Sequence, residues 1–261
     1  MKIFSPLKKL RATASKAGVS SAGQSVQSAL LQDGPLLGPA LELVDACPQV
    51  ERGVLPVPYN LTLAPGECAL IECRDPVQST FFTDFCAGQV PVGSGTIRCL
   101  GLAWKDLDAV RTDALRGCIG RLTLNKGWVD FSPMQMNILW PGLYHTYTPL
   151  QELVDAAVRL CIDFGLPGLP TVYPTRMSAV DRQRAALVRA FLNGPSLLLL
   201  EEPVQPMDDF YDAFIMQLTA ARDRGCAVVW ISSGREVWQD YIQPGMQQFR
   251  LSDGGLVSVR R

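Results

Sequence analysis

Residues 69–82 read ALIECRDPVQSTFF and join the start of a buried strand to the start of a helix, with Ser79 and Thr80 at the exit of a short loop. A strand, a loop and a Ser-Thr pair that opens a helix form the frame of a phosphate-binding loop. Such a loop uses glycines for close backbone approach and a lysine for the phosphate charge. Residues 72–78 contain neither, so the frame is present without its usual chemistry.

A second candidate lies at the end of an apolar run, where PSLLLLEEP places Glu201 and Glu202 directly after a fully buried strand. The preceding segment, SAVDRQRAALVRAFLNG, predicts an amphipathic helix with Ser178 as its N-cap and Gly194 as its stop. Both candidates have a structural reading. The two acids could cap a strand at the surface, and a Ser-Thr pair is a common helix start.

Composition narrows the class of protein. The chain has 261 residues, of which 48% are apolar and 19% charged, which fits one large α/β domain with a sizeable core. Net charge is −1, so nucleic acid is not expected as a partner. Eight cysteines form no CxxC pair and read as reduced, buried thiols. With His145 as the one histidine, neither a metal site nor a His-based triad is expected.

The chain divides into a tail and a folded domain. Residues 1–38 are basic and rich in Ser, Gly and Gln, and predict a flexible tail, which could instead touch anionic lipid or an acidic partner. Residues 39–261 form the domain. No apolar run approaches the roughly 18–20 residues that span a bilayer.

Buried apolar strands alternate with helices along the domain, which predicts a mainly parallel sheet covered by helices on both faces. Antiparallel strands at its start indicate an added β-subdomain. We expect a short helix over 79–88, a helix and turn over 107–120, and an irregular stretch rich in aromatic and Met residues over 125–149.

The sequence resembles the ATPase subunits of ABC transporters over roughly residues 39–258. The likeness is strongest over MSAVDRQRAALVRAFLNGPSLLLLEEP, where the family has LSGGQ, a Gln-Arg helix, four apolar residues, Asp-Glu and Pro. LAPGECALIE also matches the strand pair before the family's phosphate loop. The resemblance implies a P-loop NTPase-like α/β fold with an antiparallel β-subdomain and a helical subdomain at about 125–192. The spacing also resembles that of lipid-trafficking (MCE-type) transporter ATPases.

Position by position, the resemblance implies that most nucleotide-handling residues have changed. The family's phosphate-loop glycines and lysine are replaced, and its Ser-Thr is kept: Glu72, Asp75, Val77, Gln78, Ser79, Thr80. The family's signature has become Met177, Ser178, Ala179, Val180, Asp181.

Other positions follow in the same way. Glu201 stands at the metal-side aspartate, Glu202 keeps the catalytic glutamate, and Asp208 keeps the D-loop aspartate. Ser233 replaces the switch histidine. The adenine-stacking aromatic falls near Val50, and the metal-sensing glutamine falls near Leu124.

The substitutions in the loop oppose polyphosphate binding. β-branched Val77 resists positive φ, at a cost of about 1–2 kcal/mol. Pro76 offers no N–H and Gln78 no charge, while Glu72 and Asp75 add negative charge. We therefore expect neither ATP nor Mg²⁺ at this loop, no metal ligands, an idle Glu202 and no enzyme activity.

The leading functional hypothesis is a pseudo-ATPase that pairs with an active ABC ATPase subunit. Both would sit under a membrane permease in a heteromeric transporter, peripheral to the cytoplasmic face of the inner or plasma membrane, with residues 125–147 contacting the permease. Two alternatives remain: a regulatory or assembly protein without a transporter that uses the family's dimer face, and an ATPase with an altered phosphate loop. The transported substrate is not indicated.

Overall fold

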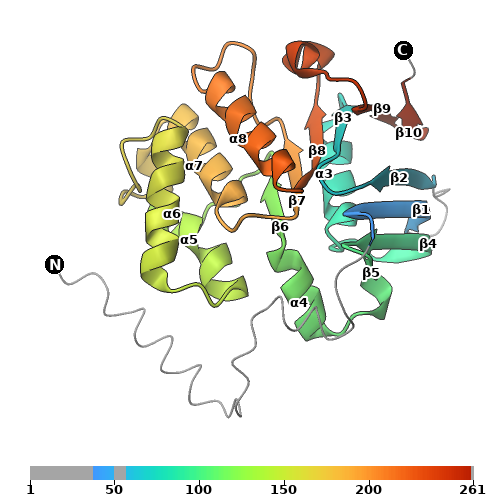
Figure 1. Cartoon of the computed structure of the whole chain (residues 1–261), viewed down its shortest axis with the longest axis horizontal. Helices are drawn as coiled ribbons and strands as arrows, with labels where there is room; N and C mark the ends of the chain where they lie inside the picture. The colour runs from blue at the N-terminus through green and yellow to red at the C-terminus, as the bar shows by residue number, and fades with distance from the viewer. Residues whose placement is uncertain (1–37, 50–56, 260–261) are drawn as a thin grey trace.

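The structure is a computed structural model that describes residues 38–49 and 57–259. Apart from Gly38, the expected tail lies outside the described residues, and so does Val50, which was aligned with the adenine-stacking position. Figure 1 shows a group of helices on one side of the molecule and a small β-sheet on the other.

The described strands form two sheets. The antiparallel sheet has the order β2-β1-β4-β5, and the larger sheet has the order β10-β9-β3-β8-β7-β6. The strand bounds are β1 Leu41–Pro48, β2 Tyr59–Leu63, β3 Cys68–Glu72, β4 Val92–Cys99, β5 Leu102–Ala103, β6 Ile119–Leu122, β7 Leu197–Glu201, β8 Ala227–Ser232, β9 Gln247–Ser252 and β10 Gly255–Ser258. Strands β9, β3, β8, β7 and β6 run parallel, and β10 closes a hairpin with β9.

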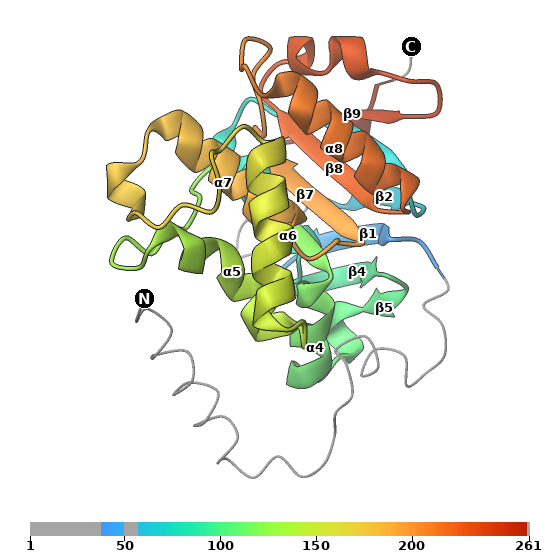
Figure 2. The same ribbon diagram turned by 60° about the vertical axis from the view of Figure 1, so that its left-hand side comes forward.

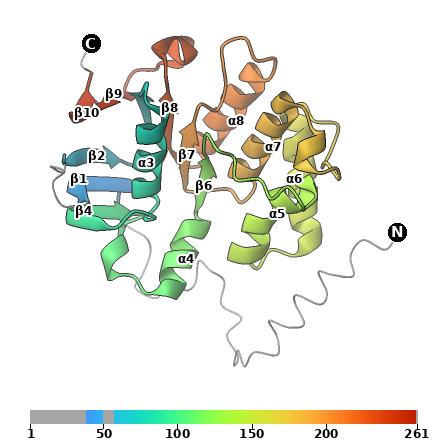
Figure 3. The same cartoon turned by 180° about the vertical axis from the view of Figure 1, so that it is seen from behind.

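Helices cover both faces of the larger sheet. Their bounds are α3 Pro76–Cys86, α4 Ala109–Gly117, α5 Met134–His145, α6 Leu150–Asp163, α7 Ala179–Phe191 and α8 Tyr211–Asp223. Short 3-10 helices span Trp104–Asp106, Pro174–Arg176, Arg235–Val237 and Gln239–Tyr241. Figure 2 brings α5, α6 and α7 forward, and Figure 3 shows α3 between the larger sheet and the antiparallel sheet.

Alternation along the parallel strands creates two cores. Leu70, Leu198 and Trp230 face the core shared with α5 to α8. Their strand neighbours Ile71 and Leu199 face the core shared with α3 and the antiparallel sheet. Because both faces are buried, the strands are apolar throughout, as parallel sheets require. The predicted fold class is confirmed: an α/β domain with a mainly parallel sheet and an antiparallel β-subdomain. The predicted domain boundaries stay predictions.

Three local predictions were wrong. Helix α3 begins at Pro76, three residues before the predicted start, because Asp75 caps it and Pro76 presets the helical φ. Strand β6 occupies part of the predicted helix and turn; at its Gly120 an added Cβ would lie 2.1 Å from the carbonyl oxygen of Ala190, so α7 packs against bare backbone.

The third error concerns the stretch predicted to be irregular. It contains the 12-residue helix α5, which continues through Pro141. Proline removes one backbone donor and usually ends a helix. Here Ile138 and Leu139, on the turn before it, are buried in the core, and tertiary packing outweighs local propensity.

Candidate functional site at the carboxyl edge of the parallel sheet

The junction between β3 and α3 is a helix start. The Asp75 carboxylate accepts a hydrogen bond from the Val77 N–H at 2.8 Å, and the Asp75 carbonyl accepts one from the Ser79 N–H at 3.0 Å. Val77 and Gln78 therefore lie in the first helical turn, where backbone N–H groups already favour a negative charge. The Asp75 carboxylate supplies that charge from within the chain.

Glu72, at the end of β3, is surrounded by arginines. Its side chain is only 7% exposed, and its Oε2 accepts from Arg250 Nη2 at 3.1 Å. Arg74 Nη2 lies 3.7 Å from the same carboxylate, and Arg235 Nε lies 4.0 Å from it. The negative charge that the sequence placed here is thus offset by three cations from three segments.

A cavity of about 350 Å³ opens beside this junction. Its walls come from the β3–α3 junction and the end of β9: Glu72, Arg74, Asp75, Gln78, Arg250, Leu251, Ser252 and Asp253. The volume falls within the range of small-molecule sites, and two of the lining residues are arginines. Arginine forks bind phosphate oxygens well, so this cavity suits an anionic group.

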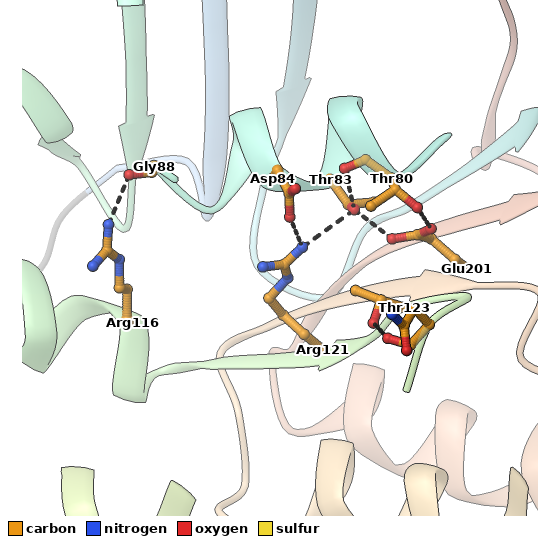
Figure 4. A network of polar contacts seen from close by, with 9 residues as sticks. Thr80, Thr83, Asp84, Gly88, Arg116, Arg121, Thr123 and Glu201 are labelled. Atoms are coloured by element: carbon orange, nitrogen blue, oxygen red, sulfur yellow. Dashed lines mark hydrogen bonds and ion pairs between the residues drawn. The ribbon is translucent and has the colours of Figure 1, made fainter. Parts of the chain in front are cut away.

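Glu201 is fully buried and its carboxylate holds α3 to β7. Oε2 accepts from Thr80 Oγ1 at 2.6 Å, and Oε1 accepts from Thr83 Oγ1 at 2.5 Å. Arg121 Nη2 lies 3.4 Å from Thr83 Oγ1 and 2.5 Å from Asp84 Oδ1 (Figure 4). The Ser79-Thr80 pair is thus more than a helix start, because Thr80 reaches the end of β7.

Glu202 is half-buried and lies in a strained part of the backbone, with φ of +44°. Its Oε2 accepts from Ser232 Oγ at 2.8 Å, and its Oε1 accepts from the Ser233 N–H at 2.5 Å. Gln205 Nε2 adds a third donor at 3.2 Å. Positive φ in a non-glycine residue is concentrated at functional sites. The position aligned with the switch histidine therefore contacts Glu202 through its backbone.

The predicted signature turn begins α7. Ser178 Oγ accepts from the Asp181 N–H at 3.0 Å, which confirms the predicted N-cap. Val180 is 45% exposed. From the next turn, Gln183 donates to the carbonyl oxygens of Glu202 and Pro203, so the start of α7 lies beside the end of β7. Asp208 is held locally, its carboxylate accepting from the Gln205 N–H at 2.6 Å.

The segment after β6 forms a further wall of the site. β6 pairs in parallel with β7, with Leu122 opposite Leu200, so residues 123 and 124 emerge beside Glu201 and Glu202. Arg189 on α7 donates to the carbonyl oxygen of Lys126. The same guanidinium lies 4.2 Å from the centroid of the Trp128 ring, and burial lowers the pKa of Arg189 to about 10.

Sequence reasoning missed several of these residues. Thr83 lies three positions after Thr80, so both hydroxyls share one face of α3, a spacing that could have indicated the contact to Glu201. Arg235 and Arg250 lie far from Glu72 in the sequence, and no local pattern indicates them. Among the described residues, no group of three or more His, Cys, Asp or Glu side chains could hold a metal ion.

Comparison with known proteins identifies the class. No family profile matches the chain. It is 29% identical over 184 residues to the phosphonates import ATP-binding protein PhnC of Hyphomonas neptunium, covering 66% of this chain and 68% of the relative. It is 30% identical over 151 residues to the taurine import ATP-binding protein TauB of Escherichia coli K12, covering 58% and 56%. The chain thus spans little more than half to two thirds of these relatives.

Solved structures agree on the fold. The dimeric structure of MJ0796, a bacterial ABC transporter cassette, matches with a TM-score of 0.72 at 18% identity, covering 83% of this chain and 96% of that one. A post-hydrolysis state of the same cassette, bound to ADP and Pi, matches with a TM-score of 0.68 at 17% identity over 85% of this chain and 99% of that one. The fold is that of an ABC cassette. These relatives are ABC transporter ATP-binding proteins and the structural neighbours are ABC cassettes, which supports the family predicted from the sequence.

Two expectations are corrected by these findings. The sequence led us to expect that the chain is not an enzyme and that it takes neither ATP nor Mg²⁺. Its relatives are named ATP-binding proteins, and a structural neighbour holds ADP and Pi, which point to an ATPase instead. The residues of the loop alone leave Glu72 as an uncompensated charge, whereas in the folded chain Arg74, Arg235 and Arg250 lie within 4.0 Å of its carboxylate. The resemblance to lipid-trafficking transporters and the assigned roles of individual residues stay predictions.

Proposed function

We propose that this chain is an ATP-hydrolysing subunit of an ABC transporter and that its phosphate loop is altered rather than lost. The observation that carries the proposal is the gathering of Glu201, Glu202, Ser233 and the start of α3 at the carboxyl edge of the parallel sheet. Ligands of open α/β sheets bind at this edge. Because the relatives are named ATP-binding proteins, ATP is the ligand to test first.

Glu201 and Glu202 are proposed to have different roles because they differ in exposure. Glu201 has both carboxylate oxygens occupied by threonine hydroxyls and acts as a structural anchor. Glu202 is half-exposed and oriented by Ser232 and Ser233, so it is the carboxylate available as a general base for an attacking water. Mg²⁺ prefers oxygen ligands and commonly binds one or two carboxylates together with substrate phosphates, which again favours Glu202 over Glu201.

The phosphate charge would be offset by arginine side chains. Arg74 and Arg250 line the cavity at the β3–α3 junction, and Arg74 is 85% exposed. An exposed guanidinium can leave a carboxylate 3.7 Å away for a more highly charged phosphate at little cost. Phosphate binding by these arginines agrees with one of the two alternative hypotheses drawn from the sequence, an ATPase with an altered phosphate loop.

The partners form the second part of the proposal. Val180 and Ala179 place side chains on the surface where a signature with glycines would present bare backbone, which favours pairing with a different cassette subunit. Phe131, Tyr144 and Tyr147 are 87%, 75% and 66% exposed around α5. Exposed aromatics suit a protein interface, and we assign this one to a permease. The complex would be peripheral to the cytoplasmic face of the membrane. No helix among the described residues has the length and apolar character to cross a bilayer.

Purification from detergent-solubilised membranes tests both parts. We expect the full chain to co-purify with a second cassette subunit and a permease, and the complex to bind and hydrolyse MgATP. Tyr144→Ala combined with Phe131→Ala should weaken recovery of the permease, whereas Met216→Ala, which removes a side chain 67% exposed on α8, should not. A complex that neither binds nor hydrolyses MgATP, or a chain recovered only with a partner unrelated to transport, would refute the proposal.

A further inference from the structure

Lysine is scarce in the described part of the chain. Residues 38–49 and 57–259 contain two lysines, Lys105 and Lys126. Lys105 lies in the 3-10 helix Trp104–Asp106 and is exposed. Lys126 follows β6, in the segment that emerges beside the ends of β7. Figure 4 shows Thr123, at the start of this segment, near Glu201. Lys126 is therefore the one described lysine at the candidate site.

The segment that carries Lys126 is held in a fixed turn. Thr123 Oγ1 donates to the Asn125 carbonyl oxygen at 2.5 Å, and the Gly127 N–H donates to Asn125 Oδ1 at 3.3 Å. Gly127 has φ of +60°, a conformation that favours glycine. Beyond the turn, the Val129 N–H donates to Asn137 Oδ1 at 2.8 Å. These contacts fix the backbone on both sides of Lys126.

Arg189, on α7, contacts the backbone of Lys126. It donates to the Lys126 carbonyl oxygen and lies over the Trp128 ring. The charge of Arg189 repels the ammonium group of Lys126 and lowers its pKa, so Arg189 is not the partner of that group.

The ammonium group of Lys126 has no fixed partner in the part of the chain that the structure describes, where it forms no hydrogen bond or ion pair. The side chain is half-buried. Burial lowers its pKa, the charge of Glu201 partly restores it, Arg189 lowers it and Glu202 raises it. Glu201 and Glu202 are themselves occupied by hydroxyl, amide and backbone donors. A half-buried cation that pairs with neither of these carboxylates has capacity for an anionic ligand.

We propose that Lys126 is the phosphate-binding lysine of this site, and that its ammonium group binds the terminal phosphate of ATP from the segment after β6. Gln78 occupies the position on α3 where the resemblance places a lysine, and it carries no charge. The cation thus comes from the neighbouring strand connection, on the opposite side of Glu201 from Arg74 and Arg250. This inference rests on the proposed ATP binding and names the residue that discriminates ATP from ADP.

The test compares three variants of the full chain in its purified complex. Titration with MgATP and MgADP should show that Lys126→Gln weakens ATP affinity by at least about 10-fold, the size expected for one charged hydrogen bond. ADP affinity should change much less, because ADP lacks the terminal phosphate. Lys126→Arg keeps the charge and should retain most of the ATP affinity. Lys105→Gln is the matched control and should behave as the unmodified chain.

A second measurement needs no variant. Acetylation of the native complex with acetic anhydride, read by mass spectrometry, should modify Lys126 slowly when ATP is present and faster with ADP, while Lys105 reacts equally in both. This result would support the assignment even if Lys126→Gln failed to fold.

The outcomes separate the two proposals. If the unmodified complex binds no nucleotide, the proposed function fails and this inference fails with it. If the complex binds ATP but Lys126→Gln binds it as Lys105→Gln does, the proposed function stands and this inference is overturned. Equal losses of ATP and ADP affinity together with a lower melting temperature would also overturn it, since they indicate a structural role for Lys126.

Discussion

Two sides of the candidate site differ in how their charges are satisfied. On the α3 side, Asp75 caps the helix and Glu72 is paired with arginines, so the charged groups that line this side are compensated within the chain. On the β6 side, Lys126 is half-buried and its ammonium group has no described partner. The site therefore has a compensated wall and an uncompensated one. A bound polyphosphate would gain most of its electrostatic stabilisation from the uncompensated wall.

The comparison also separates fold from chemistry. Ile71, Leu199 and Val229 are buried and arranged as a parallel sheet requires, whatever residues stand at its carboxyl edge. The edge loops carry no such packing constraint, so their charges can be redistributed without loss of the sheet. The same scaffold can then hold a phosphate-binding cation on a different loop.

The largest expected effect concerns Glu202. If it is the general base, Glu202→Gln should lower the hydrolysis rate of the complex by about 100-fold or more and leave ATP binding nearly unchanged. The amide keeps the size of the side chain but cannot accept the proton of the attacking water. Phosphate release under single-turnover conditions measures the rate. Glu152→Gln, an exposed substitution on α6, is the control. A rate within threefold of the unmodified complex would contradict the role assigned to Glu202.

The next effect tests the compensated wall. Thr83→Val removes one hydroxyl donor to the buried Glu201 carboxylate and should lower the free energy of unfolding by about 2–3 kcal/mol. Urea denaturation followed by circular dichroism measures the change. Thr62→Val, on an exposed position of β2, should change it by less than about 0.5 kcal/mol. Equal effects of the two substitutions would show that Thr83 is not part of a buried network.

A third prediction compares two helix caps. Asp75 caps α3 and Asp108 caps α4, each accepting from a backbone N–H at 2.8 Å. Asp75→Ala and Asp108→Ala should each lower the free energy of unfolding by about 1 kcal/mol. Asp75→Ala alone should raise ATP affinity, because it removes a negative charge from the cavity wall and frees an N–H at a helix start. Calorimetric titration measures the affinity.

The outcome for the cap pair bears directly on the compensated wall. If both substitutions lower the free energy of unfolding and neither changes ATP affinity, the start of α3 has no electrostatic effect on the bound nucleotide. The binding energy would then come from the β6 side and the arginines, and the two walls would differ more strongly in their contribution to ATP binding.

The strands of the parallel sheet and helix α7 could be predicted because buried positions follow short-range patterns of apolar residues in the sequence. The apolar strands LLLL and AVVWI, the amphipathic segment of α7 and its Ser178 cap all follow from short-range patterns. The aligned positions Glu201, Glu202 and Ser233 do meet at one edge. Helix α5 and strand β6 were missed because Pro141 and Gly120 are unfavourable locally and are tolerated only through long-range packing.

The electrostatics of the site could not be predicted in the same way. Arg250 and Glu72 are far apart in the sequence, and so are Arg189 and Lys126. The net charge of the loop residues led us to expect that Glu72 repels a phosphate. In the folded chain, guanidinium groups from three segments surround Glu72. Charge compensation is a property of the tertiary structure, and one sequence gives no pattern for it.

The smallest effect lies at the end of α5, away from both walls. Burial lowers the pKa of His145; Asp113 raises it and Arg116 lowers it, and the Tyr144 ring packs edge-on at 4.8 Å. The folded chain thus resists protonation, whereas the unfolded chain titrates near the ordinary value of about 6.5. As pH falls below about 6.5, the unfolded state binds the proton first, so the free energy of unfolding should decrease and level off once pH is below the lowered folded pKa. The decrease should be smaller than the loss of a helix cap, since His145 is only half-buried. Urea denaturation between pH 5 and 8 should show it in the unmodified chain and a reduced slope in His145→Gln; equal slopes would show that His145 is not the group that titrates.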